Sequence, residues 1–289
     1  MNANVVSCLN RSLLILTLCV LASSCTRTLL VQGYKNADTL LYLRADKYFD
    51  LSGDQAPFVK DKLKENLLWH RTSELPLVTQ FLNETARRGN DQFSTEDAVW
   101  IQANVLLMRD RVLTHIYKDT ASFLTTVSPE QIKNAREQFN KDGQELYAEF
   151  NASEEKKVEF RTKRLVSFVE FWTGGLDHSQ KTRAQEIARK LPDPMPTRMA
   201  YRATGMGSME GLVASRANQA RMEAFLKSYW LMPGAPPTPI SKQFSDLTWV
   251  SFRTSLREMD PVLTPEQREK GRQSLIALAN DLQKISAQR

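Results

Sequence analysis

Cysteine and histidine are scarce in this chain, and their scarcity excludes several classes of protein. Of its 289 residues, only three are cysteines and three are histidines. The cysteines, Cys8, Cys19 and Cys25, all lie near the N-terminus, so the rest of the chain can form no disulfide of its own. Stability must therefore come from packing, and we expect neither a disulfide scaffold nor a metal or other cofactor.

Alternating polar and apolar runs, which are typical of strands, are also nearly absent. Apolar residues instead recur every three or four positions, as expected for one face of a helix. One such stripe contains Ile101, Val105, Met108, Val112 and Ile116. The sequence predicts an all-α fold, a bundle of long antiparallel helices joined by short polar connections.

The first 24 residues have the pattern of a signal peptide. Arg11 precedes an apolar run from Leu13 to Ala22, which is shorter than the roughly 20 residues that cross a bilayer. The run ends at Leu21-Ala22-Ser23-Ser24-Cys25, which resembles the lipobox of bacterial lipoproteins, although Leu21 stands one position earlier than the usual leucine. The resemblance implies cleavage before Cys25 and its acylation. An ordinary secretory signal is the alternative.

After the anchor, residues 25–33 are interpreted as a tether and residues 34–289 as a single all-α domain. The proline-rich linker at 233–239 sets off residues 181–232 as a candidate sub-lobe. Thr26 stands where an aspartate would resemble the inner-membrane retention signal of enteric bacteria. We therefore expect a lipid anchor in the outer membrane with the body facing the periplasm, and the inner membrane is the alternative.

Five predicted helix starts share one pattern. Each has an apolar residue, then a capping side chain, two spacers and a polar side chain that can bond back to the cap. The five are Leu51–Gln55, Phe93–Asp97, Val127–Gln131, Leu176–Gln180 and Leu263–Gln267. Each pattern satisfies backbone donors that a helix cannot pair within itself.

The repeated Leu/Val-Ser/Thr-x-x-Gln form in these starts is similar to the LTxxQ motifs of the Spy and CpxP periplasmic chaperones, which implies a chaperone-like activity. Capping alone is the alternative explanation. Three other stretches, Tyr48–Gln55, Trp69–Pro76 and Phe171–Leu176, resemble an uncharacterised family of Gram-negative all-helical lipoproteins of unknown function. This second resemblance covers residues 34–289 and implies a fold and a location, but no activity.

The net charge of +6 is concentrated between residues 181 and 227. Arg198, Arg202, Arg216 and Arg221 mark a candidate basic surface for anionic lipid headgroups or an acidic protein. Alternatively, the arginine stems cover apolar surface on an ordinary solvated face. The segment is also rich in methionine, which suits either an adaptable binding surface or core packing. Nucleic acid is excluded as a partner because the protein is expected outside the cytoplasm.

The most suggestive polar cluster is Trp69, His70, Arg71 and Glu74. His70 and Glu74 continue an apolar helical stripe, so both should be partly buried. They could share a hydrogen bond, while Arg71 could pair with an acidic residue on a neighbouring helix. A buried polar network is the main interpretation, with a partner contact and a metal or acid–base site as alternatives. No further histidine lies at a spacing that completes such a site.

Two other motifs carry no chemistry. The glycine-rich stretch Gly205–Gly211 lacks the preceding strand and the lysine of a phosphate-binding loop, so it is interpreted as a flexible turn before a helix near Leu212. Ser153–Lys156 matches Ser-x-x-Lys but lacks a Lys-Thr-Gly partner and is interpreted as a charged helix start.

Together these features predict a lipid-anchored, non-enzymatic binding protein that is chaperone-like towards envelope proteins and contacts a protein or peptide through residues 181–232. The alternatives are a structural or assembly adaptor of the envelope and a hydrolase that uses His70 and Glu74.

Overall fold

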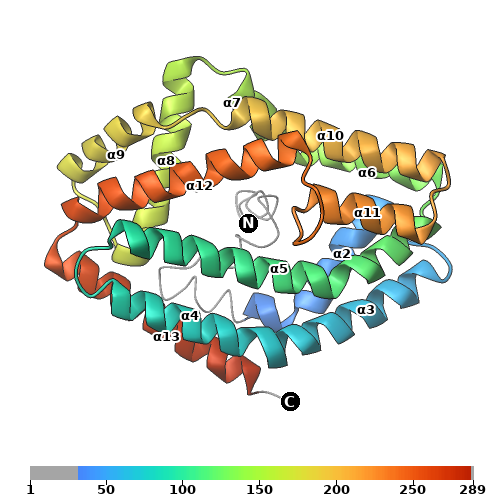
Figure 1. Cartoon of the computed structure of the whole chain (residues 1–289), viewed down its shortest axis with the longest axis horizontal. Coiled ribbons are helices and arrows are strands. Elements are labelled where there is room, and N and C mark those ends of the chain that lie inside the picture. The colour runs from blue at the N-terminus through green and yellow to red at the C-terminus, as the bar shows by residue number, and fades with distance from the viewer. Residues whose placement is uncertain (1–31, 288–289) are drawn as a thin grey trace.

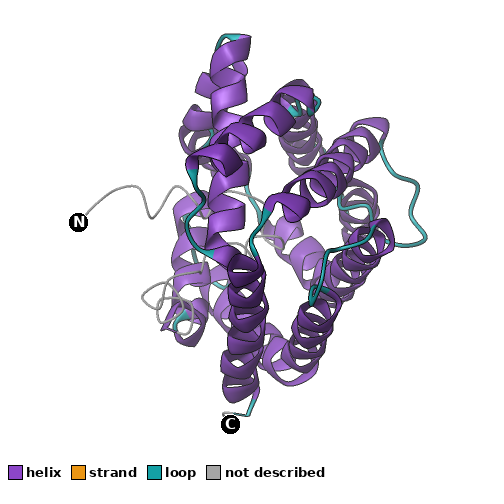
Figure 2. Cartoon of the chain, turned by 90° about the vertical axis from the view of Figure 1, so that its left-hand side faces the viewer, coloured by secondary structure: helices purple, strands orange, loops and turns teal. Residues whose placement is uncertain are grey.

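The computed structural model describes residues 32–287, and within them the chain folds as twelve α-helices with no strand (Figures 1 and 2). The predicted all-α fold is confirmed. The first half contains α2 (Ala37–Phe49), α3 (Gln55–Trp69), the π-helix η2 (His70–Glu74), α4 (Leu75–Arg88), α5 (Thr95–Thr126), α6 (Pro129–Asp142) and α7 (Gln144–Phe150). The second contains α8 (Glu154–Thr173), α9 (His178–Lys190), α10 (Met195–Ala214), α11 (Gln219–Tyr229), α12 (Pro239–Met259), the 3₁₀ turn η3 (Asp260–Val262) and α13 (Pro265–Ser286).

The signal peptide, the lipobox with Cys25 and most of the tether lie outside the described residues. Within the described part of the chain, no helix is both long and apolar enough to cross a membrane.

The two halves repeat one arrangement of helices. In the first half α2 packs on α3 and α6, and α3 packs on α5. In the second half α8 packs on α9 and α13, and α9 packs on α12. The remaining long helix of each half crosses to the other half, because α4 packs along α13 and α10 packs against α6 (Figure 1). The two halves therefore have approximately the same helix arrangement. They are held together because α4 and α10 each pack on a helix of the opposite half.

Pairs of glutamines join the helix hairpins within each half. Gln180 and Gln267 exchange hydrogen bonds between their side-chain amides at 2.7 and 3.0 Å. Gln55 and Gln131 do the same at 2.6 and 3.2 Å. Each glutamine also donates to the backbone carbonyl that precedes its partner's helix start, as Gln267 does to Gly175. We call each pair, Gln180 with Gln267 and Gln55 with Gln131, a glutamine clamp. The motif that the sequence repeats therefore forms one clamp in each half.

Four of the five predicted capping starts are confirmed. Ser94, Ser128, Asp177 and Thr264 each accept from the amide three residues on, and that residue's side chain accepts from the backbone amide of the cap. The fifth prediction, a cap at Ser52, is wrong because α3 begins only at Gln55. Gly53 adopts a left-handed φ of 53°, which turns the chain before the helix begins.

The glycine-rich stretch is not a turn, as the sequence predicted, but lies inside α10. Gly205 is buried where α10 meets the ring of Tyr229, and a methyl group there would overlap that ring. Packing therefore outweighs the low helix propensity of glycine at this position.

The segment 181–232 spans most of α9 and all of α10 and α11, which pack mainly on helices outside the segment. Helix α9 lies on α8 and α12, α10 lies on α6, α7 and α12, and α11 lies on α5. The proline-rich linker crosses from α11 to α12 as irregular chain, and its last proline, Pro239, opens α12.

Candidate functional site

The predicted polar cluster lies at the π-helix η2, where the chain passes from α3 to α4. A π-turn inserts one additional residue per turn, and such turns are frequent at functional sites. The indole of Trp69 stacks on the imidazole of His115 with ring centroids 3.7 Å apart. His70 and Arg71 are half-buried and Glu74 is 1% exposed, so the predicted burial of the cluster is confirmed.

The partners within this cluster differ from those expected. Glu74 binds Arg111 of α5, which donates from Nη2 at 2.7 Å and from Nε at 3.0 Å. His70 Nδ1 lies 2.9 Å from the hydroxyl of Tyr34, and no hydrogen bond joins His70 to Glu74. The π-turn changes the helical phase between these two positions, so a spacing of four residues no longer brings their side chains together.

Burial dominates the electrostatics of this cluster. Desolvation lowers the pKa of His70 below its ordinary value, although the negative charge of Glu74 opposes the shift. Burial also raises the pKa of the Tyr34 hydroxyl. A neutral imidazole held by a tyrosine and a carboxylate held by an arginine form a polar network that fixes α3, α4 and α5 against one another. No group of three or more metal-ligating side chains occurs anywhere in residues 32–287.

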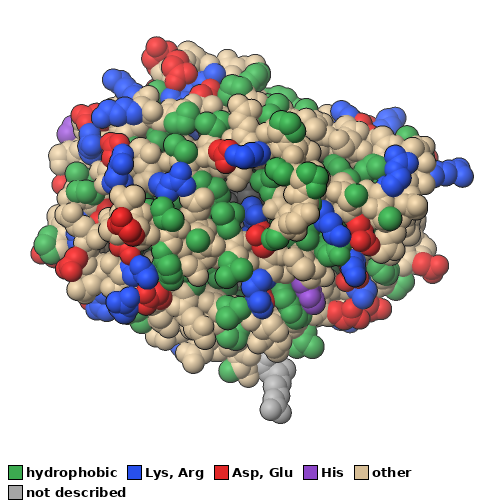
Figure 3. All heavy atoms as spheres, in the orientation of Figure 1, with side chains coloured by type: hydrophobic (Ala, Val, Ile, Leu, Met, Phe, Trp, Pro, Cys, Tyr) green, Lys and Arg blue, Asp and Glu red, His purple; other side chains and the backbone are tan. Residues whose placement is uncertain are grey.

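The four arginines of the predicted basic surface lie in different surroundings. Arg216 and Arg221 are exposed at the junction of α10 and α11, while Arg198 is half-buried. Arg202 points into the molecule, with its guanidinium 3.7 Å from the ring centroid of Phe139. Desolvation lowers the pKa of Arg202. On the face shown in Figure 3, basic and acidic side chains are interspersed.

The methionines of the same segment belong to the core. Met195, Met206, Met222 and Met232 are each at most 6% exposed. Core packing, the alternative weighed for the methionine-rich composition, therefore accounts for these four side chains.

The feature that sequence reasoning missed is a cavity of about 480 Å³ between α4, α5, α8, α12 and α13. Its wall is almost wholly apolar and includes Phe81, Ile101, Phe168, Trp172, Phe252 and Leu275. This volume falls within the roughly 300–1,000 Å³ typical of ligand pockets, which combine apolar walls with a few polar groups. None of the residues of the Trp69–Glu74 cluster lines it.

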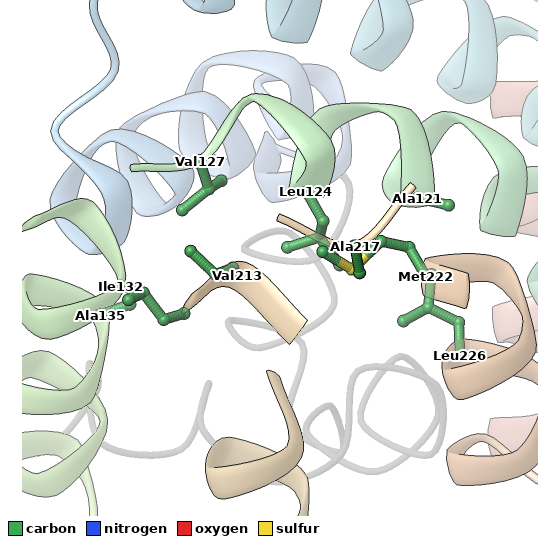
Figure 4. Close-up of a cluster of buried hydrophobic side chains, with 9 residues drawn as sticks. All are labelled: Ala121, Leu124, Val127, Ile132, Ala135, Val213, Ala217, Met222 and Leu226. Carbon is green, nitrogen blue, oxygen red and sulfur yellow. The ribbon is translucent and has the colours of Figure 1, made fainter. Parts of the chain in front are cut away.

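Comparison of the two halves indicates why the cavity is present in only one of these positions at this size. The corresponding region of the other half lies between α2, α5, α6 and α10 and holds an apolar core (Figure 4) beside a smaller cavity of about 280 Å³. That core is completed by Met222 and Leu226 of α11, each at most 4% exposed. Helix α11 has no counterpart between α4 and α5, which residues 89–94 connect directly. The larger cavity therefore lies where one half lacks the helix that occupies much of the corresponding space in the other.

Two residues that line the cavity each have one polar atom that is enclosed by protein and has no hydrogen-bond partner among the described residues. These atoms are Nη1 of Arg161, on α8, and Oγ of Ser251, on α12. Three further arginines on the wall are already paired: Arg164 with Glu149, Arg268 with Asp260 and Arg272 with Glu269.

Comparison with known proteins identifies a family but no characterised relative. A family described as a family of unknown function (DUF6279) matches residues 47–226. Those residues contain all three stretches on which the resemblance to an uncharacterised family rests. No curated protein and no solved structure matches the chain. The resemblance to the Spy and CpxP chaperones is not supported, and the glutamine clamps give its repeated motif a structural explanation.

Proposed function

The chain belongs to this family of unknown function, and from its own geometry we propose that it is a non-enzymatic binding protein that takes an apolar ligand into the cavity. The carrying observation is that the cavity is large and apolar, while in the other half α11 occupies much of the equivalent space and leaves a smaller cavity of about 280 Å³. Covering the apolar wall with a ligand removes it from water, which favours binding by about 25 cal/mol per Å² of apolar surface buried.

The place of action in this proposal is the cell envelope. The signal-peptide pattern and the lipobox-like residues before Cys25 support a mature protein that is acylated on Cys25 and faces the periplasm from the outer membrane, with the inner membrane as the alternative. Metabolic labelling with radioactive palmitate tests this part. Label should enter the wild-type protein and not the Cys25→Ala variant, and an unlabelled wild-type protein would refute the anchor.

Binding of a fluorescent probe tests the binding site. The mature chain with Cys25→Ser, which carries no acyl chain of its own, should increase the fluorescence of the neutral probe N-phenyl-1-naphthylamine. Ser255 lines the cavity and is half-buried, so Ser255→Phe should fill part of the space and weaken probe binding about tenfold or more. The matched control is Gln243→Phe, which adds the same ring at an exposed position on the same helix.

The outcomes separate the candidate functions. Loss of probe binding in Ser255→Phe but not in Gln243→Phe supports the cavity as the site. Equal binding by all three proteins would place the probe elsewhere and refute the cavity. A chaperone acting on envelope proteins would in addition slow the aggregation of an unfolded client, whereas an assembly adaptor would capture one defined partner and leave unfolded clients unaffected.

A further inference from the structure

We infer that the outward face of α2 lies on the bilayer that holds the lipid anchor, with Leu40 and Leu43 in contact with the lipid. The inference rests on the acylated Cys25 of the proposed function and adds to it the surface that meets the membrane. It is carried by two exposed leucines on the first helix after the tether, at an edge of the fold where no residue is buried.

Helices α2 and α3 differ from the other helices in their burial. Each of the other ten α-helices in residues 32–287 contains at least one buried residue, whereas α2 and α3 contain none. Helix α2 packs on α3 and α6, and these two neighbours leave its remaining side uncovered. The pair therefore forms the least covered edge of the described fold.

The exposed leucines of the described residues are concentrated on this edge. Leu40 is 53% exposed and Leu43 is 55% exposed. Residues three apart are neighbours on a helix surface, so these two side chains form one apolar spot on the outward face of α2. Leu68 of α3 is a third exposed leucine, and Leu107 of α5 is the fourth. Exposed apolar side chains concentrated on one edge are typical of surfaces that meet a membrane or a partner.

The tether favours the bilayer as the partner of this face. The chain is fixed to the fold at Tyr34, whose hydroxyl lies 2.9 Å from Nδ1 of His70. Nine positions separate Tyr34 from Cys25, a length that spans at most about 30 Å when fully extended. Helix α2 begins three residues later, at Ala37. An anchor at Cys25 therefore keeps α2 beside the bilayer, and a second protein would have to enter the gap between them.

Apolar contact rather than charge accounts for this docking. Helices α2 and α3 together contain five basic and four acidic residues, so the pair carries almost no net charge. Interfacial helices place their apolar side chains about 5–10 Å into the boundary between headgroups and acyl chains. Two leucines bind lipid weakly on their own, but the anchor makes their contact intramolecular and raises its effective concentration.

Site-specific fluorescence in the anchored protein tests the inference. The sequence has no cysteine after Cys25, whose thiol the anchor blocks, so Leu43→Cys provides a single site for a nitrobenzoxadiazole label. The acylated variant is reconstituted into vesicles of phosphatidylethanolamine and phosphatidylglycerol. These vesicles also contain a phosphatidylcholine that carries a nitroxide on its acyl chain. The nitroxide quenches a label that reaches the depth of the lipid chains.

The matched control is Leu107→Cys, because Leu107 is 59% exposed on α5, which lies in front of α2 in Figure 1. The label at Leu43→Cys should be quenched at least about twice as strongly as the label at Leu107→Cys. Leu40→Cys provides a second reading from the same face and should behave like Leu43→Cys. The difference should persist at about 1 M salt, where the Debye length falls to about 3 Å.

The outcomes separate failure of the inference from failure of the anchor. Equal quenching of the α2 and α5 labels, in protein that floats with the vesicles, would overturn the contact of α2 and leave the anchor intact. Loss of the difference in high salt would assign the contact to charge and also overturn the inference. A label at Leu43→Cys that is already shielded in the soluble Cys25→Ser background would show that a second copy, and not lipid, covers α2. A wild-type chain that does not float would refute the anchor itself.

Discussion

Gln180 and Gln267 hold each other through a reciprocal pair of amide hydrogen bonds, although 87 positions separate them in the chain. Each side-chain oxygen also accepts from the backbone amide of its own capping residue, at 3.0 Å in both cases. One side chain therefore caps its own helix and joins it to a second helix hairpin. Gln55 and Gln131 repeat the reciprocal pair in the other half, where only Gln131 also caps its own helix, at Ser128.

We predict that Gln267→Ala lowers the free energy of unfolding by about 2–3 kcal/mol. The substitution removes the capping interaction at Thr264 and leaves the amide of Gln180, which is 4% exposed, without its partner. Gln131→Ala should cost only about 1 kcal/mol, because its partner Gln55 is half-buried and can turn to water. Urea unfolding measures both values. Equal losses would contradict the difference in burial.

The clamp also predicts coupling between its members. The double variant Gln180→Ala/Gln267→Ala should be more stable than the sum of the two single losses implies, by about 1 kcal/mol, because each single variant already breaks the pair. Strict additivity would show that the two amides do not interact in solution.

The ion pair between Glu74 and Arg111 should respond unequally to truncation. The Glu74 side chain is 2% exposed and that of Arg111 is 43% exposed. Arg111→Ala strands a carboxylate in the interior and should cost about 3–5 kcal/mol. Glu74→Ala leaves an arginine that can reach water and should cost less. Chemical denaturation of both variants tests this order, with the exposed Lys156→Ala as a control expected to change stability by under about 1 kcal/mol.

Two glycines of α10 should respond in opposite directions to alanine. A methyl group at Gly205 would overlap the ring of Tyr229, which stacks on Tyr201 with centroids 4.4 Å apart, so Gly205→Ala should destabilise the fold by about 1–3 kcal/mol. Nothing lies within 4 Å of a methyl group at Gly207. Gly207→Ala should therefore stabilise the helix by about 0.5–1 kcal/mol. Thermal melts with the same sign for both variants would contradict the packing described.

The lowered pKa of His70 predicts a pH dependence of stability. The unfolded chain binds a proton at this imidazole near its ordinary pKa of 6.5, whereas the folded chain binds it only at lower pH. The free energy of unfolding should therefore fall as the pH falls through 6.5 towards the pKa of the folded state. His70→Gln should flatten this slope, and the exposed His178→Gln should not.

Urea unfolding between pH 8 and pH 5 measures this slope above the range in which most carboxylates titrate. Parallel curves for the wild-type chain and His70→Gln would contradict the burial of a neutral imidazole.

The elements that could be predicted from the sequence are those fixed by local interactions. Ser94, Ser128, Asp177 and Thr264 begin helices because their capping bonds span only three residues. The start at Ser52 failed where Gly53 turns the chain and Gln55 takes a partner from another helix. Local pattern alone could not reveal that partner.

The functional cavity was beyond sequence reasoning for a different reason. Its walls use the same apolar residue types as the core, such as Phe168 and Leu275, and come from helices spread over nearly 200 residues. What distinguishes it is the absence of a helix equivalent to α11. In the sequence, this absence is visible only as a difference in the length of two connections. Residues 89–94 connect α4 to α5, whereas residues 215–238 connect α10 to α12. They acquire meaning only once the two halves are aligned in space.

Mass spectrometry of the ligand that co-purifies with the protein tests the central claim most directly. The Cys25→Ser chain, secreted into the periplasm and purified without detergent, should carry close to one equivalent of an apolar ligand, and Ser255→Phe should carry far less. A Cys25→Ser chain that is empty under native conditions, and remains empty after incubation with N-phenyl-1-naphthylamine, would contradict a ligand-binding cavity.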